Sequence, residues 1–254
     1  MISLYTSDWS IKGIKTVLFD KDGTFVDLHY FWGKMTELRS LEIIKEFNLN
    51  ESHLKKLCFF LGYDVASKKM IPDGITALYS RSKIIEIFVE RLKEFGVITT
   101  IEKIERIFDK VSEKFYQDIK NYIKPIPEAI EFIKLLHDKD VKIGVVTSDS
   151  VKSTDLTLKL FGWENYFDVI IGRESSDYAK ESGEPTKLAL KLLGARPDET
   201  IMIGDAQTDY FSAKNAGIDK TILVTTGQVG KDELKKYSKF VLDNLSEINV
   251  EEVL

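Results

Sequence analysis

Cysteine and histidine are scarce in this chain, and long apolar runs are missing from it. Among 254 residues there is one cysteine, Cys58, and there are three histidines. A single cysteine excludes a disulfide within the chain and is typical of a reducing compartment. So few thiol and imidazole ligands disfavour a zinc site. No apolar run approaches the ~20 residues of a membrane span, and residues 1–10 lack the pattern of a signal peptide. We expect a soluble, cytoplasmic protein.

Basic blocks are also missing, and the formal net charge is -5. This balance argues against a general nucleic-acid binder, and nothing in the charge pattern points to a membrane partner. With 43% hydrophobic residues, the chain is long enough for one large domain or one domain that carries an insert. We expect a small-molecule partner, and the sequence leaves the oligomeric state open.

Short apolar runs alternate with helical segments over most of the chain. The runs are rich in Val and Ile and mostly uninterrupted, as expected for strands that are covered on both faces. They cover residues 16–20, 141–148, 167–172, 200–205, 220–226 and, more weakly, 239–243. Helical patterns lie between them at residues 127–137, 151–161, 184–193 and 209–216. This order predicts an α/β fold, a Rossmann-like parallel sheet with crossover helices.

One segment breaks the alternation, because its apolar residues return every three or four positions. Its helical faces begin with Met35 and Leu54 and continue with residues 84–95 and 101–119. We therefore predict that residues 28–121 form an inserted α-helical domain without a strand, and that residues 1–27 and 122–254 form one discontinuous core. Three arginines of the insert, Arg39, Arg81 and Arg91, are expected on solvated helix faces.

The first predicted strand ends in two acids, in the sequence Asp20-Lys21-Asp22-Gly23-Thr24. Aspartate disfavours strands and favours their ends, so both acids should lie at the carboxyl end of a buried strand. Open α/β sheets bind their ligands at that edge. Two such acids can hold a divalent cation, and one of them can act as a nucleophile. The same pattern also occurs in ordinary turns.

Three further signals follow later strands. Thr147 closes a strand, where its hydroxyl and the N–H groups of Ser148 and Asp149 can grip an anion or simply cap a helix. Lys180 lies in a loop before a helix and can supply a charge for phosphate, although the chain has many lysines.

The last signal is the sequence from Gly204 to Asp209. Asp205 and Asp209 offer two more acids at a strand end, although Asp209 could serve only as a helix cap. Taken together, the acids can chelate a hard cation, and the hydroxyl and the lysine can hold the oxygens of a phosphoryl group.

These motifs resemble, in order, those of the haloacid dehalogenase-type superfamily of phosphohydrolases, over about two thirds of the chain. The helical insert is similar to the α-helical cap of phosphoglycolate-phosphatase-like and β-phosphoglucomutase-like members. The resemblance implies that Asp20 is the nucleophile and forms an aspartyl-phosphate, and that Asp22 is the general acid and base. Many relatives have prolines near the motif lysine, where this chain has Glu181 and Gly183.

The resemblance also implies a cofactor and its ligands. Mg²⁺ would be bound by the Asp20 and Asp205 carboxylates and the Asp22 carbonyl, with Asp209 as a further ligand or holding a coordinated water. Thr147, Ser148 and Lys180 would bind the phosphoryl oxygens. Because Lys187 lies nearby, the choice of Lys180 rests on its spacing to Gly204.

Asp22 bears on the reaction type, because a phosphate ester leaves as an alkoxide that needs a proton, whereas a halide does not. We therefore expect a Mg²⁺-dependent phosphatase that hydrolyses a small phosphomonoester. Two alternatives remain open at this point. One is a phosphomutase of the β-phosphoglucomutase type that acts on a sugar phosphate, and the other is a non-catalytic protein that binds a phosphorylated ligand.

Overall fold

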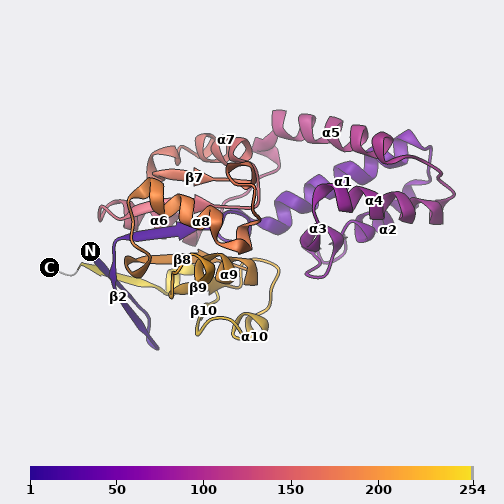
Figure 1. The fold of residues 1–254 in the computed structure, drawn as a ribbon. Helices are drawn as coiled ribbons and strands as arrows, with labels where there is room; N and C mark the ends of the chain where they lie inside the picture. Colours follow the sequence, from indigo (N-terminus) through magenta and orange to yellow (C-terminus); the bar gives the residue numbers. More distant parts are fainter. Residues whose placement is uncertain (253–254) are drawn as a thin grey trace. The chain divides into compact units, whose positions relative to one another are not determined.

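The computed structural model describes residues 1–252, and the chain divides into two compact units. The first, which we call the α/β unit, comprises Met1–Asp27 and the chain from Pro125 onward. The second, which we call the helical unit, comprises Leu28–Lys124. The colours of Figure 1 follow the chain through both units.

A six-stranded parallel sheet forms the centre of the α/β unit, in the order β10-β9-β8-β3-β6-β7. Every predicted strand is present, and each is shorter than predicted. The strands are β3 (Thr16–Phe19), β6 (Lys142–Val146), β7 (Val169–Ile171), β8 (Thr200–Gly204), β9 (Thr221–Val224) and β10 (Phe240–Leu242). The predicted α/β fold class with a Rossmann-like sheet is confirmed.

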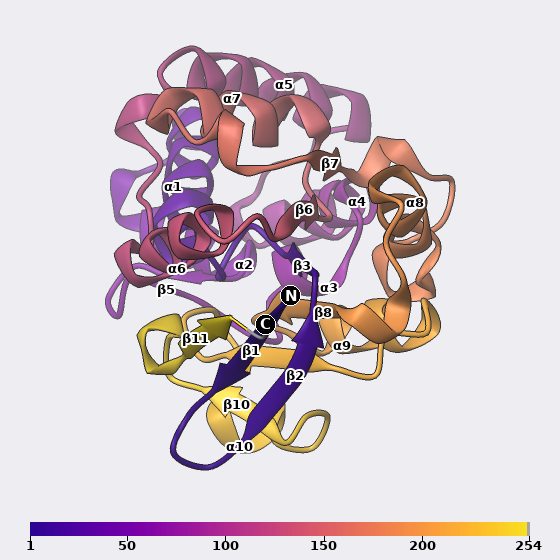
Figure 2. The same ribbon diagram turned by 90° about the vertical axis from the view of Figure 1, so that its left-hand side faces the viewer.

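Helices cover both faces of this sheet (Figure 2). They are α6 (Pro127–His137), α7 (Val151–Phe161), α8 (Glu184–Leu193), α9 (Gln207–Asn215) and the short α10 (Lys231–Leu234). Successive residues of a strand point to opposite faces. Leu18 accordingly packs in a buried cluster with Leu190 of α8 and Ala213 of α9. The ring of Phe19 instead meets Phe132 of α6, with 6.4 Å between the ring centroids.

The chain reverses its direction across the sheet between β3 and β8. From β3 it proceeds outward to β6 and β7, and it then returns to β8 on the other side of β3. A reversal of this kind leaves a crevice at the carboxyl ends of the two central strands, where open α/β sheets bind ligands. The predicted acids Asp20 and Asp205 directly follow these two strands.

A second, antiparallel sheet in the α/β unit was not predicted. It consists of β1 (Ile2–Tyr5), β2 (Ser10–Ile14) and β11 (Asn249–Glu252), in the order β11-β1-β2. Ile2 pairs with Glu252, so the two ends of the described chain lie side by side (Figure 2). Two consecutive glutamates disfavour a strand locally, and β11 forms because β1 offers it a pairing partner.

The helical unit contains the four helical segments that were predicted. Its helices are α1 (Leu28–Glu46), α2 (Leu54–Phe60), the short α3 (Ile75–Leu78), α4 (Arg81–Leu92) and α5 (Ile101–Gln117). Phe88 and Phe108 lie in its buried core. The expectation that this segment has no strand was wrong, because β4 (Tyr63–Asp64) pairs with β5 (Lys69–Met70) in a short hairpin. No helix within residues 1–252 is long and apolar enough to cross a membrane.

Arg39 of α1 also departs from expectation, because it is buried rather than solvated. It is only 7% exposed, its guanidinium lies 4.5 Å from the centroid of the Phe108 ring, and it donates to the Ser112 hydroxyl at 3.4 Å. The aromatic face stabilises a guanidinium inside the helical unit by a cation–π interaction. The periodicity of apolar residues could not predict this burial, because an arginine on an apolar helix face interrupts the apolar pattern.

The two chain segments that flank the helical unit lie next to each other in the α/β unit. Val26 forms an antiparallel bridge with Pro125, and the Ile126 N–H donates to the Phe25 carbonyl at 2.9 Å. The α/β unit therefore closes on itself at the positions where the chain leaves and returns.

Short 3₁₀ helices complete the described structure. They are η1 (Glu51–His53), η2 (Lys93–Phe95), η3 (Ile119–Asn121), η4 (Glu164–Tyr166), η5 (Arg173–Ser175), η6 (Lys180–Ser182), η7 (Pro197–Glu199) and η8 (Leu245–Glu247). Of these, η6 matters most for the site, because it begins at the predicted phosphate-binding lysine.

Candidate active site

Three aspartates meet at the carboxyl ends of β3 and β8. The Asp20 N–H donates to the Ile203 carbonyl of β8 at 2.8 Å, which fixes Asp20 at the end of the ladder. Asp205 follows β8, and Asp209 lies in the first turn of α9. All three are buried, and one carboxylate oxygen from each lies within 4.8 Å of the others. Two motifs that are far apart in the sequence thus form one acidic cluster.

A buried lysine offsets part of the charge of this cluster. Lys180 Nζ lies 2.6 Å from Asp20 Oδ1 and 2.5 Å from Asp209 Oδ1. Lys187, the other lysine close by in the sequence, instead forms an exposed ion pair with Glu184 at 2.8 Å. The structure therefore brings Lys180, and not Lys187, to the acids.

Asp209 uses its two carboxylate oxygens differently. Oδ2 accepts hydrogen bonds from the N–H groups of Asp205 and Ala206, both at 3.0 Å. These contacts satisfy N–H groups at the start of α9, as an acid in the first turn of a helix commonly does. Oδ1 faces Lys180 within the cluster. The helix-capping contacts thus leave one oxygen of Asp209 in the acidic cluster.

Two glycines make room for the Asp205 carboxylate. Gly23 has a φ of +88°, and a Cβ atom on it would lie 2.5 Å from the Asp205 carboxyl carbon. A side chain on Gly227, in the loop after β9, would overlap the same carboxylate. The Thr226 hydroxyl ties this loop to the Gly23 carbonyl at 2.5 Å. The loop after β9 is therefore part of the site, although no sequence motif pointed to it.

Asp22 lies beside a second buried lysine. Lys21 Nζ is 2.5 Å from Asp22 Oδ1 and 3.1 Å from Asp149 Oδ2. Neither Lys21 nor the Asp149 side chain was singled out from the sequence. The only available signal was the charge of residues that stand next to predicted site residues.

Thr147 and Ser148 lie at the end of β6. Thr147 is buried, and its N–H donates to the Ile171 carbonyl of β7 at 2.9 Å. The Asp149 N–H, which was expected to face an anion, donates to Thr147 Oγ1 at 3.1 Å. Ser148 is exposed, and Ser150 caps α7 by accepting from the Ser153 N–H at 3.1 Å. In this conformation the threonine hydroxyl orders the loop between β6 and α7.

Comparisons with known proteins agree with this arrangement of motifs. Residues 17–224 match the sequence profile described as haloacid dehalogenase-like hydrolase. The chain belongs to this family. The resemblance inferred from the motifs is thereby confirmed.

Individual relatives cover nearly the whole chain. Pyrophosphatase PpaX of Bacillus mycoides is 25% identical over 92% of this chain and 95% of its own length. The crystal structure of a predicted phosphoglycolate phosphatase from Haemophilus somnus matches 93% of this chain and 97% of its own, with a TM-score of 0.72 and 18% identity. The crystal structure of a protein from Thermotoga maritima assigned to the β-phosphoglucomutases matches 92% of this chain and 96% of its own, with a TM-score of 0.67 and 18% identity. The two structural likenesses concern the fold alone.

Burial and mutual repulsion dominate the electrostatics of the acidic cluster. Burial raises the pKa of Asp20 to about 6, although Lys180 opposes this. Burial and the Asp20 and Asp209 carboxylates raise the pKa of Asp205 well above its ordinary value. Burial alone would lower the pKa of Lys180, but its two carboxylate partners outweigh burial and raise it. The cluster therefore favours added positive charge, whether from protons or from a cation.

The second lysine has a comparable environment. Burial raises the pKa of Asp22 to about 6, and Lys21 opposes this rise. Burial would also raise the pKa of Asp149, but the Lys21 ammonium and the hydrogen bonds to this carboxylate together outweigh burial and lower that pKa. Asp22 and Asp149, which share one lysine, thus differ in the direction of their pKa shifts.

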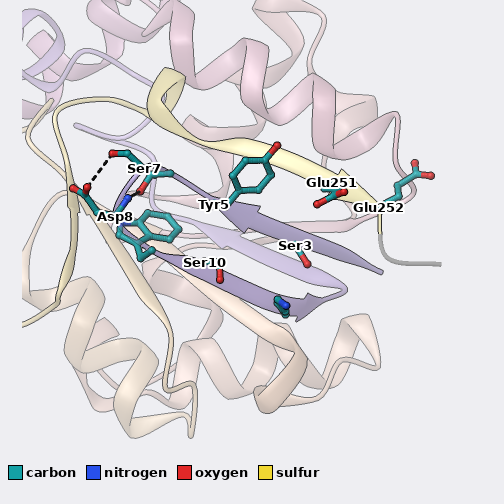
Figure 3. A pocket seen from close by; sticks show the side chains of 10 residues that line it. Ser3, Tyr5, Ser7, Asp8, Ser10, Glu251 and Glu252 are labelled. Atoms are coloured by element: carbon teal, nitrogen blue, oxygen red, sulfur yellow. Dashed lines mark hydrogen bonds between the residues drawn. The ribbon is translucent and has the colours of Figure 1, made fainter.

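A hollow elsewhere on the α/β unit contains none of these residues. Figure 3 shows it on the antiparallel sheet, where the Ser7 hydroxyl donates to Asp8 at 2.9 Å. Its lining is formed by Ser3, Tyr5, Thr6, Ser7, Asp8, Trp9, Ser10, Lys12, Glu251 and Glu252. The predicted site residues lie at the carboxyl edge of the parallel sheet instead.

The burial and mutual repulsion of these acids lead to a prediction about the stability of the protein. Because burial raises the pKa values of Asp20 and Asp205 on folding, these two carboxyls bind more protons in the folded metal-free protein than in the unfolded chain above about pH 4. Their contribution to stability therefore falls as the pH rises through about 6. In EDTA, Asp205→Asn should raise the thermal midpoint by roughly 5 °C at pH 7.5. The difference from the unchanged protein should shrink toward pH 4.5.

The matched control is Asp243→Asn, which removes an exposed carboxylate paired with Lys231. Its thermal midpoint should change little, because exposed ion pairs contribute little to stability. An Asp205→Asn variant that is less stable than the unchanged protein at pH 7.5 would contradict the predicted repulsion.

Proposed function

We propose that this protein is a Mg²⁺-dependent phosphatase that transfers the phosphoryl group of a small substrate first to Asp20 and then to water. The buried cluster of acids around Lys180 carries the proposal. Phosphoryl transfer needs a nucleophile and fixed positive charge against the phosphoryl oxygens. Membership of the haloacid dehalogenase-like hydrolases supports the same class of reaction.

The donor set fits Mg²⁺. Asp20, Asp205 and Asp209 place carboxylate oxygens within 4.8 Å of one another, and hard cations prefer such oxygen ligands. A divalent ion would also compensate for the burial and the repulsion that raise the pKa values of Asp20 and Asp205. When bound, Mg²⁺ would supply positive charge beside the phosphoryl oxygens. We assign these three carboxylates and the Asp22 carbonyl as its ligands.

The side chains then divide the reaction between them. Lys180 holds Asp20 Oδ1, which leaves Oδ2 to attack phosphorus and form an aspartyl-phosphate. Asp22 gives a proton to the leaving oxygen and takes one from the water that later attacks the phosphoryl group. Its pKa of about 6 suits both roles near neutral pH.

Three groups are proposed to hold the phosphoryl oxygens. Lys180 provides a fixed ammonium at the cluster, and the Thr147 hydroxyl lies at the end of the neighbouring strand β6. The exposed Ser148 adds its N–H. Binding a phosphate would require the Thr147 hydroxyl to donate to it while still accepting from Asp149, which a hydroxyl can do.

The substrate class is proposed from the same chemistry. A small phosphomonoester offers one phosphoryl group and a leaving oxygen that needs a proton from Asp22. The relatives named pyrophosphatase PpaX add inorganic pyrophosphate, which has the same two features, to the compounds that should be tested.

The direct test is phosphate release from a panel of compounds, with Mg²⁺ and with EDTA. The panel contains p-nitrophenyl phosphate, phosphoglycolate, sugar phosphates, nucleotides and pyrophosphate. We expect Mg²⁺-dependent release from at least one compound. Asp20→Asn should lower turnover by roughly 10³-fold or more, because an amide cannot replace the attacking carboxylate.

The matched control for this test is Asp155→Asn, which removes an exposed carboxylate of α7 that pairs with Lys159. It should keep full activity. Substantial activity of Asp20→Asn would exclude Asp20 as the nucleophile. Conversion of a sugar phosphate to its isomer without phosphate release would favour a phosphomutase. Binding of phosphate esters without turnover would favour a non-catalytic role.

We also propose that the helical unit is the substrate-selecting cap of this enzyme. Because Val26 is bridged to Pro125, a short Gly-Ser linker between Asp27 and Pro125 can replace it without opening the α/β unit. The shortened protein should still hydrolyse p-nitrophenyl phosphate, but its ranking of the natural compounds should change. An unchanged ranking, measured as relative kcat/KM, would contradict the cap role.

A further inference from the structure

The pairing of Lys21 with two carboxylates has no role in the proposed reaction so far. The Lys21 side chain is 0% exposed, and its ammonium lies between Asp22 and Asp149 at 2.5 and 3.1 Å. Burying an ammonium group costs several kcal/mol unless carboxylates and hydrogen bonds compensate for it. A neutral side chain would avoid this cost, so the buried charge needs an explanation.

Backbone hydrogen bonds hold the segment that carries Lys21 and Asp22 in place. The Lys21 carbonyl accepts hydrogen bonds from the N–H groups of Thr24, Phe25 and Val26, at 3.3, 3.1 and 3.1 Å. This turn fixes the positions of Lys21 and Asp22 relative to the end of β3. The Lys21 side chain can therefore hold the Asp22 carboxylate in one direction.

Asp149 is fixed on the other side. Its Oδ1 accepts from the Ser150 N–H at 2.7 Å, and its carbonyl accepts from the Arg173 N–H at 2.9 Å. Its Oδ2 is left to face Lys21. Because Asp149 stays in place, the Lys21 ammonium keeps a counter-charge even when the Asp22 carboxyl is neutral, carrying the proton for the leaving group.

We propose that Lys21, anchored by Asp149, is a positioning residue that orients the Asp22 carboxyl for proton transfer to the leaving group. The inference rests on the proposed function, in which Asp22 is the general acid. As the bond from phosphorus to the leaving oxygen breaks, the electron pair stays on that oxygen and the proton moves to it from Asp22. Lys21 keeps its own protons throughout.

Leaving groups of different basicity test this role. The double variant Lys21→Met/Asp149→Asn removes both charges together, which avoids leaving one of them buried without a partner. It should lower kcat/KM by about 100-fold for an alkyl phosphate, whose leaving group needs the proton. For p-nitrophenyl phosphate, whose leaving group is a stable anion, the loss should stay below about threefold. The ratio kcat/KM is the quantity to compare, because it reports the steps up to release of the leaving group and excludes the later hydrolysis of the aspartyl-phosphate, in which Asp22 acts as base for both esters.

Two single variants accompany the double variant. Asp149→Asn keeps Lys21 and the hydrogen bond from Ser150, and it should show a smaller loss with the same preference for the alkyl ester. The control Lys142→Met removes a lysine at the other end of β6, whose Nζ donates to the Leu193 carbonyl at 2.5 Å. It should leave kcat/KM unchanged for both esters. Thermal midpoints establish that each variant is folded.

Asp22→Asn separates failure of the inference from failure of the proposed function. The positioning role alone would be overturned if Asp22→Asn lost activity selectively on the alkyl ester while Lys21→Met/Asp149→Asn and Asp149→Asn did not. Equal losses of kcat/KM on both esters in the folded double variant would also overturn it. If Asp22→Asn shows no selective loss of activity on the alkyl ester, Asp22 is not the general acid, and the proposed role of Lys21 is excluded as well.

Discussion

Two buried lysines, each held between two aspartates, are the interaction on which the site depends. Lys180 joins Asp20 to Asp209, and Lys21 joins Asp22 to Asp149. Without these ammonium groups, mutual repulsion and burial would strongly disfavour four charged carboxylates, from three segments of the chain, in one small buried region. The parallel sheet supplies the geometry, because its strands end at the same edge and each delivers one segment there.

The negative charge of Asp205 is only partly compensated by the buried lysines. Gly23 and Gly227 leave it just enough space, and its pKa remains well above the ordinary value. A structure built only for stability would place an apolar or amide side chain at that position. The retained negative charge is what a divalent cation requires, so the local cost in stability and the proposed catalytic function have the same origin.

Much of the α/β unit was predictable because its strands are continuous apolar runs with acids at their ends. The helix boundaries were also predictable where the sequence marks them, as Pro127 does at the start of α6. The antiparallel sheet was not, since β11 contains Glu251 and Glu252 and depends on pairing with β1. The acids and Lys180 followed from motif order. The contacts of Lys21 with Asp149 and of Gly227 with Asp205 did not, because they join segments that only the fold brings together.

The central claim is that Asp20 carries the phosphoryl group during turnover. Rapid acid quenching during hydrolysis, followed by borohydride reduction and peptide mass spectrometry, tests it directly, because borohydride converts an aspartyl-phosphate to homoserine. We expect homoserine at position 20, and none when substrate or Mg²⁺ is omitted. Continued turnover with Asp20 unmodified at every quench time, or homoserine at a different aspartate, would contradict it.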